Sequence, residues 1–192
     1  MADTILRPIG AGDETSLPTQ YPASGEHWEK VDESTSDGND TYVSAFIAYP
    51  TTGGYRDLYT IESETFDDTI SNVIIYASCK KVGLVGDASS VYLGVKTGGT
   101  IYASSAKALS ASYAEYSHSY TTNPNTGIAW TQADIDALQL NLVLQMNRYG
   151  TGGGRASYGV CTQTWIKVVT VSARDKRLSV RSLWRGKKRI GR

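Results

Sequence analysis

Few residues in this chain could take part in acid–base or metal chemistry. Its 192 residues include two histidines, His27 and His118, and two cysteines, Cys79 and Cys161. Neither histidine has a carboxylate and a nucleophile at the spacing of a catalytic triad, or ligands at the spacing of a zinc site. Both cysteines lie in strand-like runs, where reduced, partly buried thiols are expected. We therefore predict a protein that is not an enzyme and has no cofactor.

Four carboxylates, Asp32, Glu33, Asp37 and Asp40, lie close together in the sequence, with Gly38 among them. Such oxygen-rich clusters can bind Ca²⁺, but this spacing is not that of an EF-hand loop. We favour a carboxylate-rich turn or a docking surface for a basic segment, and predict no metal site.

Two other patterns suggest binding but have simpler explanations. Tyr113, Tyr116, Tyr120 and Trp130 could form a platform for sugar stacking, yet in a chain with 13 tyrosines packing on a sheet face explains them better. The run 152–155, Gly-Gly-Gly-Arg, is predicted to be a loop, because no Gly-Lys-Ser/Thr follows it as in a phosphate-binding loop.

The strongest signal is the uneven distribution of charge. Residues 174–192 contain nine Lys and Arg against one acidic residue, a net charge of +8. Residues 1–173 contain ten basic and eighteen acidic residues, a net charge of −8. Because like charges repel and little apolar area can be buried, the C-terminal segment cannot fold on itself. We favour a segment that binds something acidic over a solvated tail, and we call it the basic arm.

The basic arm alternates apolar and basic residues as a strand does. An extended arm of this kind suits addition to the edge of another sheet. The acidic body of a neighbouring copy is the partner that we favour, and nucleic acid is the competing one, on weaker grounds. The predicted partner-binding residues are Arg177, Leu178, Val180, Arg181, Trp184, Arg185, Lys187, Lys188 and Arg189.

The elements that would position these residues are mainly short strands. Residues 1–40 are predicted to be an acidic extended N-terminal arm with short strands at Thr4–Arg7 and Trp28–Val31. Residues 41–173 are predicted to be a β-sandwich body and residues 174–192 the basic C-terminal arm. Strand patterns cover 41–49, 55–61, 70–82, 91–96, 100–104, 110–120, 140–146 and 160–171, with glycine turns at 53–54 and 97–99 and a loop at 149–159.

One helix interrupts the strands. Thr131 is followed three positions later by Asp134, close to a capping box, and Ile135 and Leu138 then share a helix face. Roughly nine strands with one short helix predict an all-β, antiparallel two-sheet sandwich that is jelly-roll-like.

Five segments in this order resemble a family of jelly-roll-like structural proteins of tailed phages, prophages and environmental viral sequences. They are Leu6–Asp13, Trp28–Glu33, Thr41–Val43, the stretch Tyr120–Gln139 with YTTNPNTGIAWTQADIDALQ, and Cys161–Val168 with CTQTWIKV. The resemblance covers about residues 4–170 and implies no catalytic residues. The segment after Ala173 departs from the family pattern, so the basic arm is a feature of this member.

Together these observations predict a virion structural protein, a capsid decoration or cement protein that holds subunits together through its terminal arms. The alternatives are a tail, neck or fibre component, or a carbohydrate-binding module for host recognition. Other virion subunits, including copies of this chain, are the expected partners. The chain has no apolar run of 18 residues and its N-terminus is not a secretory signal, so we expect synthesis in the host cytoplasm, no membrane contact and location in the virion.

Overall fold

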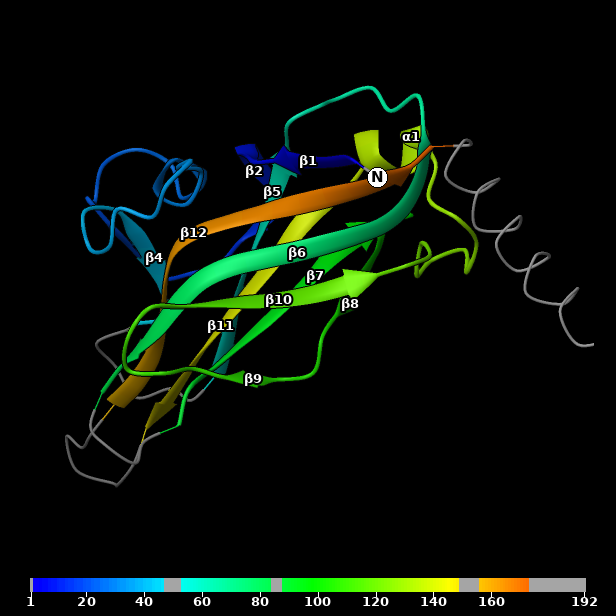
Figure 1. The fold of residues 1–192 in the computed structure, drawn as a ribbon. Coiled ribbons are helices and arrows are strands. Elements are labelled where there is room, and N and C mark those ends of the chain that lie inside the picture. Colours follow the sequence, from blue (N-terminus) through cyan, green and yellow to red (C-terminus); the bar gives the residue numbers. More distant parts are fainter. Residues whose placement is uncertain (1, 47–52, 84–87, 149–155, 173–192) are drawn as a thin grey trace, which may run out of the picture.

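Two layers of antiparallel strands form the body of the protein (Figure 1). The computed structural model describes residues 2–46, 53–83, 88–148 and 156–172. Within these residues the all-β class with one short α-helix is confirmed. The elements are β1 (Ala2–Leu6), β2 (Pro8–Thr15), β3 (Thr19–Tyr21), the 3₁₀ helix η1 (Trp28–Lys30), β4 (Tyr42–Ser44), β5 (Gly53–Ile61), β6 (Thr69–Val82), β7 (Ser90–Thr97), β8 (Thr100–Ala103), β9 (Lys107–Ala108), β10 (Ala114–Tyr120), α1 (Gln132–Asp136), β11 (Gln139–Arg148) and β12 (Ala156–Val171).

The first layer is built on the two longest strands, β6 and β12. They pair from Tyr158 and Val82 at one end to Val171 and Thr69 at the other. The other edge of β6 carries β10, and the other edge of β12 carries β1 and β4. β3 extends the layer by pairing with β4.

The second layer has the order β2, β5, β11 and β7, and β7 also pairs with β8 and β9. A short pairing between the end of β11 and the start of β12 joins the two layers, so they form one sheet that curls on itself. β5, β7 and β11 lie in one layer and β6, β10 and β12 in the other. The chain therefore crosses repeatedly between the layers, and the predicted antiparallel two-layer sandwich is confirmed.

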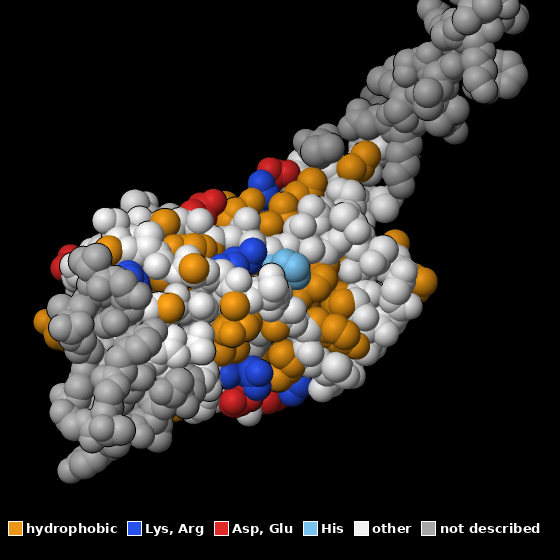
Figure 2. Space-filling view, turned by 90° about the horizontal axis from the view of Figure 1, so that it is seen from below, with side chains coloured by type: hydrophobic (Ala, Val, Ile, Leu, Met, Phe, Trp, Pro, Cys, Tyr) orange, Lys and Arg blue, Asp and Glu red, His pale blue; other side chains and the backbone are white. Residues whose placement is uncertain are grey.

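The core lies between the layers because alternate residues of the long strands point inward. In β6 the inward side chains are Val73, Ile75, Ala77 and Cys79, all fully buried. Opposite them β11 contributes Leu140, Leu142, Leu144 and Met146, also fully buried. Seen from the side of β8, β9 and β10, hydrophobic side chains lie among polar ones, and charged side chains form small mixed clusters (Figure 2).

Two local predictions are confirmed in detail. Gly98 and Gly99 both have positive φ, 56° and 79°, and join β7 to β8 in a two-residue hairpin turn. Thr131 caps α1 through a complete capping box: its hydroxyl accepts from the Asp134 backbone N–H, and the Asp134 carboxylate accepts from the Thr131 backbone N–H. None of the helices in the described residues is long and apolar enough to cross a membrane.

The first forty residues are built into the body and do not form a separate arm. β1 lies along β12 in register from Ala2–Thr170 to Leu6–Ile166, and β2 pairs with β5. Leu6, Leu17 and Val31 are buried at 0–3% exposure. Although the segment is acidic, these apolar residues give it side chains to bury, so it packs on the sandwich.

Other local predictions differ from the structure. Trp28–Lys30 is a 3₁₀ turn and not a strand, because Lys30 N–H donates to His27 O and Val31 N–H donates to Trp28 O. Gly53 and Gly54 begin β5 and are not a turn. Ala156–Gly159 belong to β12, whereas residues 149–155 of the predicted loop lie outside the described residues. The basic arm, residues 174–192, also lies outside them.

Placing a charge between the layers should strongly destabilise the protein. Ile75→Asp and Leu142→Asp would each put a carboxylate without a partner at a fully buried position. The cost is about 5 kcal/mol, which corresponds to a fall in Tm of about 10–20 °C for a chain of this size. Ile128→Asp is the matched control, because Ile128 is 63% exposed. Thermal unfolding followed by circular dichroism would contradict the core assignment if both core variants unfolded like the control.

Candidate functional site

A buried carboxylate, Asp57, holds His27 in place, a histidine for which the sequence indicated no role. Asp57 Oδ1 accepts from the backbone N–H groups of Ser16 (2.8 Å) and Leu17 (2.9 Å). Oδ2 accepts from the Tyr59 hydroxyl (2.9 Å) and lies 2.6 Å from His27 Nδ1. Asp57 and Tyr59 are at most 1% exposed. Asp57 thus ties β5 to the segment after β2 and to the residue before η1.

This His27–Asp57 pair has the form of the orienting half of a catalytic triad. A triad also needs a nucleophile at the other ring nitrogen. Within the described residues no hydroxyl or thiol is hydrogen-bonded to that nitrogen of His27. The nearby Ser16 hydroxyl donates to Arg56 O (2.7 Å) and accepts from Arg56 N–H (2.8 Å). The arrangement therefore supports a structural role for the pair.

The second histidine and both cysteines also pack in the body. The His118 ring makes an edge contact with Tyr120 at 4.6 Å between centroids, and burial, with a smaller contribution from Lys107, lowers its pKa. Cys79 and Cys161 face each other across β6 and β12 as buried free thiols. Burial raises the pKa of Cys79, so this thiol is held in its unreactive protonated form.

The acidic cluster is a hydrogen-bonded turn. The Thr41 hydroxyl lies 2.5 Å from Glu33 Oε1 and 2.7 Å from Asp37 Oδ2, but has one proton to donate. Thr162 donates to the other oxygen of Asp37 at 2.7 Å. Burial, helped by Asp37 and Asp32, raises the pKa of Glu33. The described residues contain no group of three or more His, Cys, Asp or Glu that could hold a metal ion.

The predicted tyrosine platform is not an open surface. Trp130 is 4% exposed and belongs to the core, where its Nε1–H donates to Tyr120 O (3.0 Å). The Tyr120 hydroxyl donates to Tyr102 O (2.9 Å), and Tyr116 packs against the core. The packing interpretation is therefore confirmed for these three residues. The glycine run and the predicted partner-binding residues of the basic arm lie outside the described residues.

A different aromatic surface lies on the outer face of the first layer. Strand register places it there: Tyr21 is opposite Tyr42, Ser44 is opposite Val160, and Val82 is opposite Tyr158. Side chains at directly paired positions point to the same face, so four adjacent strands contribute to one hollow of about 330 Å³. We call it the aromatic groove; it is lined by Thr19, Tyr21, Asn39, Tyr42, Ser44, Phe46, Lys80, Val82, Tyr158 and Val160.

The rings of the aromatic groove are paired, with one ring of each pair exposed. Tyr21 stacks on Tyr42 with 5.5 Å between ring centroids and 18° between planes. Phe46 leans on Tyr158 at 4.9 Å and 51°. Tyr21 is 52% exposed and Phe46 40%. Each pair thus fixes one ring against the body and leaves the outer ring open to a ligand.

One cation, Lys80, also lines the aromatic groove. Lys80 Nζ donates to Asn39 Oδ1 (2.6 Å) and lies 4.4 Å from the centroid of the Tyr113 ring. The Tyr113 hydroxyl donates to the same oxygen of Asn39 (3.2 Å). In the described part of the chain Lys80 forms no ion pair with a carboxylate. Its charge is therefore held in place by neutral groups.

Sequence reasoning missed the aromatic groove because its residues come from four separate segments. A β-bulge between Cys161 and Gln163 also reverses the alternation in β12. Val160 before the bulge and Trp165 after it therefore lie on the same outer face, although their spacing is odd. The sequence contains one signal for the groove. Tyr42 and Phe46 alternate with the small apolar residues Val43 and Ala45, which are buried, so the two aromatic rings are expected on the outer face.

No family model and no curated protein matches the chain.

Removing the Asp57 carboxylate should destabilise the fold. Asp57→Ala would leave two backbone N–H groups and the Tyr59 hydroxyl without their acceptor in a buried place. We expect the free energy of unfolding to fall by about 3–5 kcal/mol. Urea unfolding measures this, and Asp3→Ala, at an exposed carboxylate, is the control. Equal midpoints for the two variants would contradict this role of Asp57.

Neutralising Glu33 should make the protein more stable at neutral pH. Because its pKa is raised, the folded state holds this proton more tightly than the unfolded state. The resulting stability is present below the ordinary pKa of 4.5 and is lost as the pH rises through the raised value. Glu33→Gln should therefore have the same Tm as the wild type at about pH 3.5 and a higher Tm than the wild type at about pH 7.

Asp13→Asn provides the control of opposite sign, because hydrogen bonding to Lys96 and Gln139 lowers the Asp13 pKa. Any stability from Asp13 is present above its ordinary pKa of 3.8 and lost as the pH falls through the lowered value. This variant should not gain stability at neutral pH. Thermal scans at both pH values would contradict the assignment if Glu33→Gln lost stability at pH 7.

Proposed function

We propose that the protein is a non-enzymatic structural protein of a virion that binds neighbouring subunits through its basic arm. The observation that carries this proposal is the division of charge, −8 in residues 1–173 and +8 in residues 174–192. A polarised chain of this kind attracts other copies of itself in a head-to-tail sense. The capsid surface, as a decoration or cement protein, is the location that we propose within the particle.

The place where the basic arm leaves the body supports this proposal. β12 ends at Val171, which pairs with Thr69 at the start of β6. The segment before β6 is acidic, with Glu62, Glu64, Asp67 and Asp68. α1 lies against this segment, because Gln132 Nε2 donates to Glu64 O (2.7 Å), and it adds two further carboxylates, Asp134 and Asp136. An acidic end of the sandwich thus lies beside the root of a basic segment.

The free strand edges give a second line of support. In the described residues β10 pairs only with β6, so its other edge has backbone groups open to a further strand. An alternating segment such as the basic arm could add to this edge. Burial of Leu178, Val180 and Trp184 would then contribute affinity, because exposed ion pairs contribute only about 0–1 kcal/mol each.

Deleting residues 174–192 should abolish or severely weaken self-association or binding to particles, because the charge and the apolar face of the basic arm are lost together. Trp184→Ala should weaken association more than Arg192→Ala, because burial of the indole outweighs one exposed charge. Raising the salt from about 0.1 M to 1 M shortens the Debye length from about 10 Å to 3 Å and should weaken association without abolishing it. Sedimentation of the three variants and the wild type at both salt concentrations measures these effects.

Normal assembly of the truncated protein would show that the basic arm is not needed for assembly. A truncated protein that loses only affinity for DNA, with a steep dependence on salt, would support nucleic acid as the partner instead. The double variant His27→Ala, His118→Ala should be less stable, because Asp57 loses its imidazole partner, but should assemble as the wild type does at temperatures where it is folded.

A further inference from the structure

The aromatic groove gathers half of the exposed large hydrophobic side chains found in the described residues. Six such side chains are exposed, and three of them, Tyr21, Phe46 and Val82, line this groove. The others are scattered singly on β1, β2 and the segment before α1. Exposed aromatic rings that gather in one hollow are typical of a binding site.

The lining of the aromatic groove is mixed in character. Tyr21 and Phe46 present ring surface, and Thr19 and Asn39 contribute hydroxyl and amide groups, whereas Ser44 lines the groove but is buried. Rings beside hydroxyl and amide groups complement a sugar, which has an apolar C–H face and a rim of hydroxyl groups. The volume of about 330 Å³ suits a ligand of one or two sugar rings.

The positive charge of Lys80 indicates which charge the ligand of the groove should carry. Lys80 lines the groove, and its ammonium group, held on Asn39, forms no ion pair with a carboxylate in the described part of the chain. Contacts with Asn39 and Tyr113 hold it in place and leave donor capacity on the nitrogen, which has three hydrogens. A carboxylate on the ligand would complement this charge with a strong hydrogen bond.

We propose that the aromatic groove is a binding site for an acidic saccharide, whose ring stacks on Tyr21 and whose carboxylate pairs with Lys80. This proposal is independent of the subunit contact proposed for the basic arm. Lys80 would repel a basic segment, so the arm is a poor occupant of the groove. Single-stranded nucleic acid also stacks on aromatic rings, but it carries one charge per nucleotide. One lysine on a body of net charge −8 suits one carboxylate better than a chain of phosphates.

The test uses the full chain on an array that carries oligosaccharides ending in uronic or sialic acid beside their neutral counterparts. Saccharides that bind are then titrated by calorimetry. We expect Lys80→Gln to weaken binding of the carboxylated saccharides roughly tenfold and to leave their neutral counterparts unchanged. Tyr21→Ala should weaken both kinds roughly tenfold, because it removes the stacking surface.

Two control variants match these changes at places outside the groove. Ile9→Ala removes a side chain that is 52% exposed, as Tyr21 is, and Lys107→Gln removes a charge from β9. Both should bind as the wild type does, and so should Trp184→Ala, which tests the basic arm. If Tyr21→Ala does not fold, the affinity of Lys80→Gln for the carboxylated saccharides tests the proposal by itself.

Three results would overturn the proposal. The wild type could bind no carboxylated saccharide on the array. Lys80→Gln could bind these saccharides as tightly as the wild type, which would place any binding site elsewhere. Finally, an oligothymidylate probe could bind in a Lys80-dependent way while the saccharides do not, which would make the groove a site for single-stranded nucleic acid.

Discussion

The pairing of β6 with β12 is the contact on which the rest of the structure depends. These strands have 14 and 16 residues and remain paired over nearly their whole length. All other strands of the first layer attach to one of these two, directly or through β4. Their inner faces supply one side of the core, and their outer faces, extended by β3 and β4, form the aromatic groove. The bulge after Cys161 lets one strand serve both purposes, because it changes which residues face outward.

The N-terminal segment completes this framework through one buried carboxyl group. A carboxyl group in the interior is costly unless its oxygens are hydrogen-bonded. Asp57 meets this condition with two backbone N–H groups, one hydroxyl and one imidazole. Three of these four partners belong to residues 16–27, so the carboxylate is satisfied only when that segment is in place. A single side chain thus couples the N-terminal segment to the second layer.

The sequence predicted the parts of the fold that depend on local periodicity. The alternation in β6 and β11, the paired glycines after Thr97 and the capping box at Thr131 each depend on neighbouring residues. The N-terminal segment was mispredicted because its net acidity concealed three widely spaced buried residues, Leu6, Leu17 and Val31. The aromatic groove and the Asp57 contacts could not be predicted, because both join segments that are distant in the sequence: His27 and Asp57 are 30 residues apart, and Tyr21 and Tyr42 are 21 apart.

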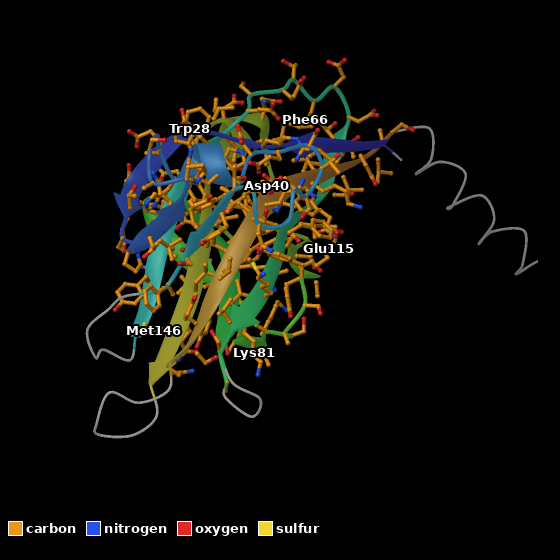
Figure 3. All side chains as sticks on the ribbon, turned by 90° about the vertical axis from the view of Figure 1, so that its left-hand side faces the viewer. Trp28, Asp40, Phe66, Lys81, Glu115 and Met146 are labelled. Carbon is orange, nitrogen blue, oxygen red and sulfur yellow. The ribbon has the colours of Figure 1, made fainter. Side chains whose placement is uncertain are left out.

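The positions of the two proposed sites bear on whether both could act in one particle. Lys81 and Met146 lie at one end of the sandwich, beside the strand ends that form the aromatic groove, whereas Trp28 and Phe66 lie at the other end (Figure 3). Eleven residues of β12 separate Val160 in the groove from Val171 at the root of the basic arm, a span of about 36 Å for an extended strand. A subunit held through the acidic end would therefore leave the groove free. A carboxylated saccharide and a basic arm also have opposite charges, so neither would compete for the site of the other.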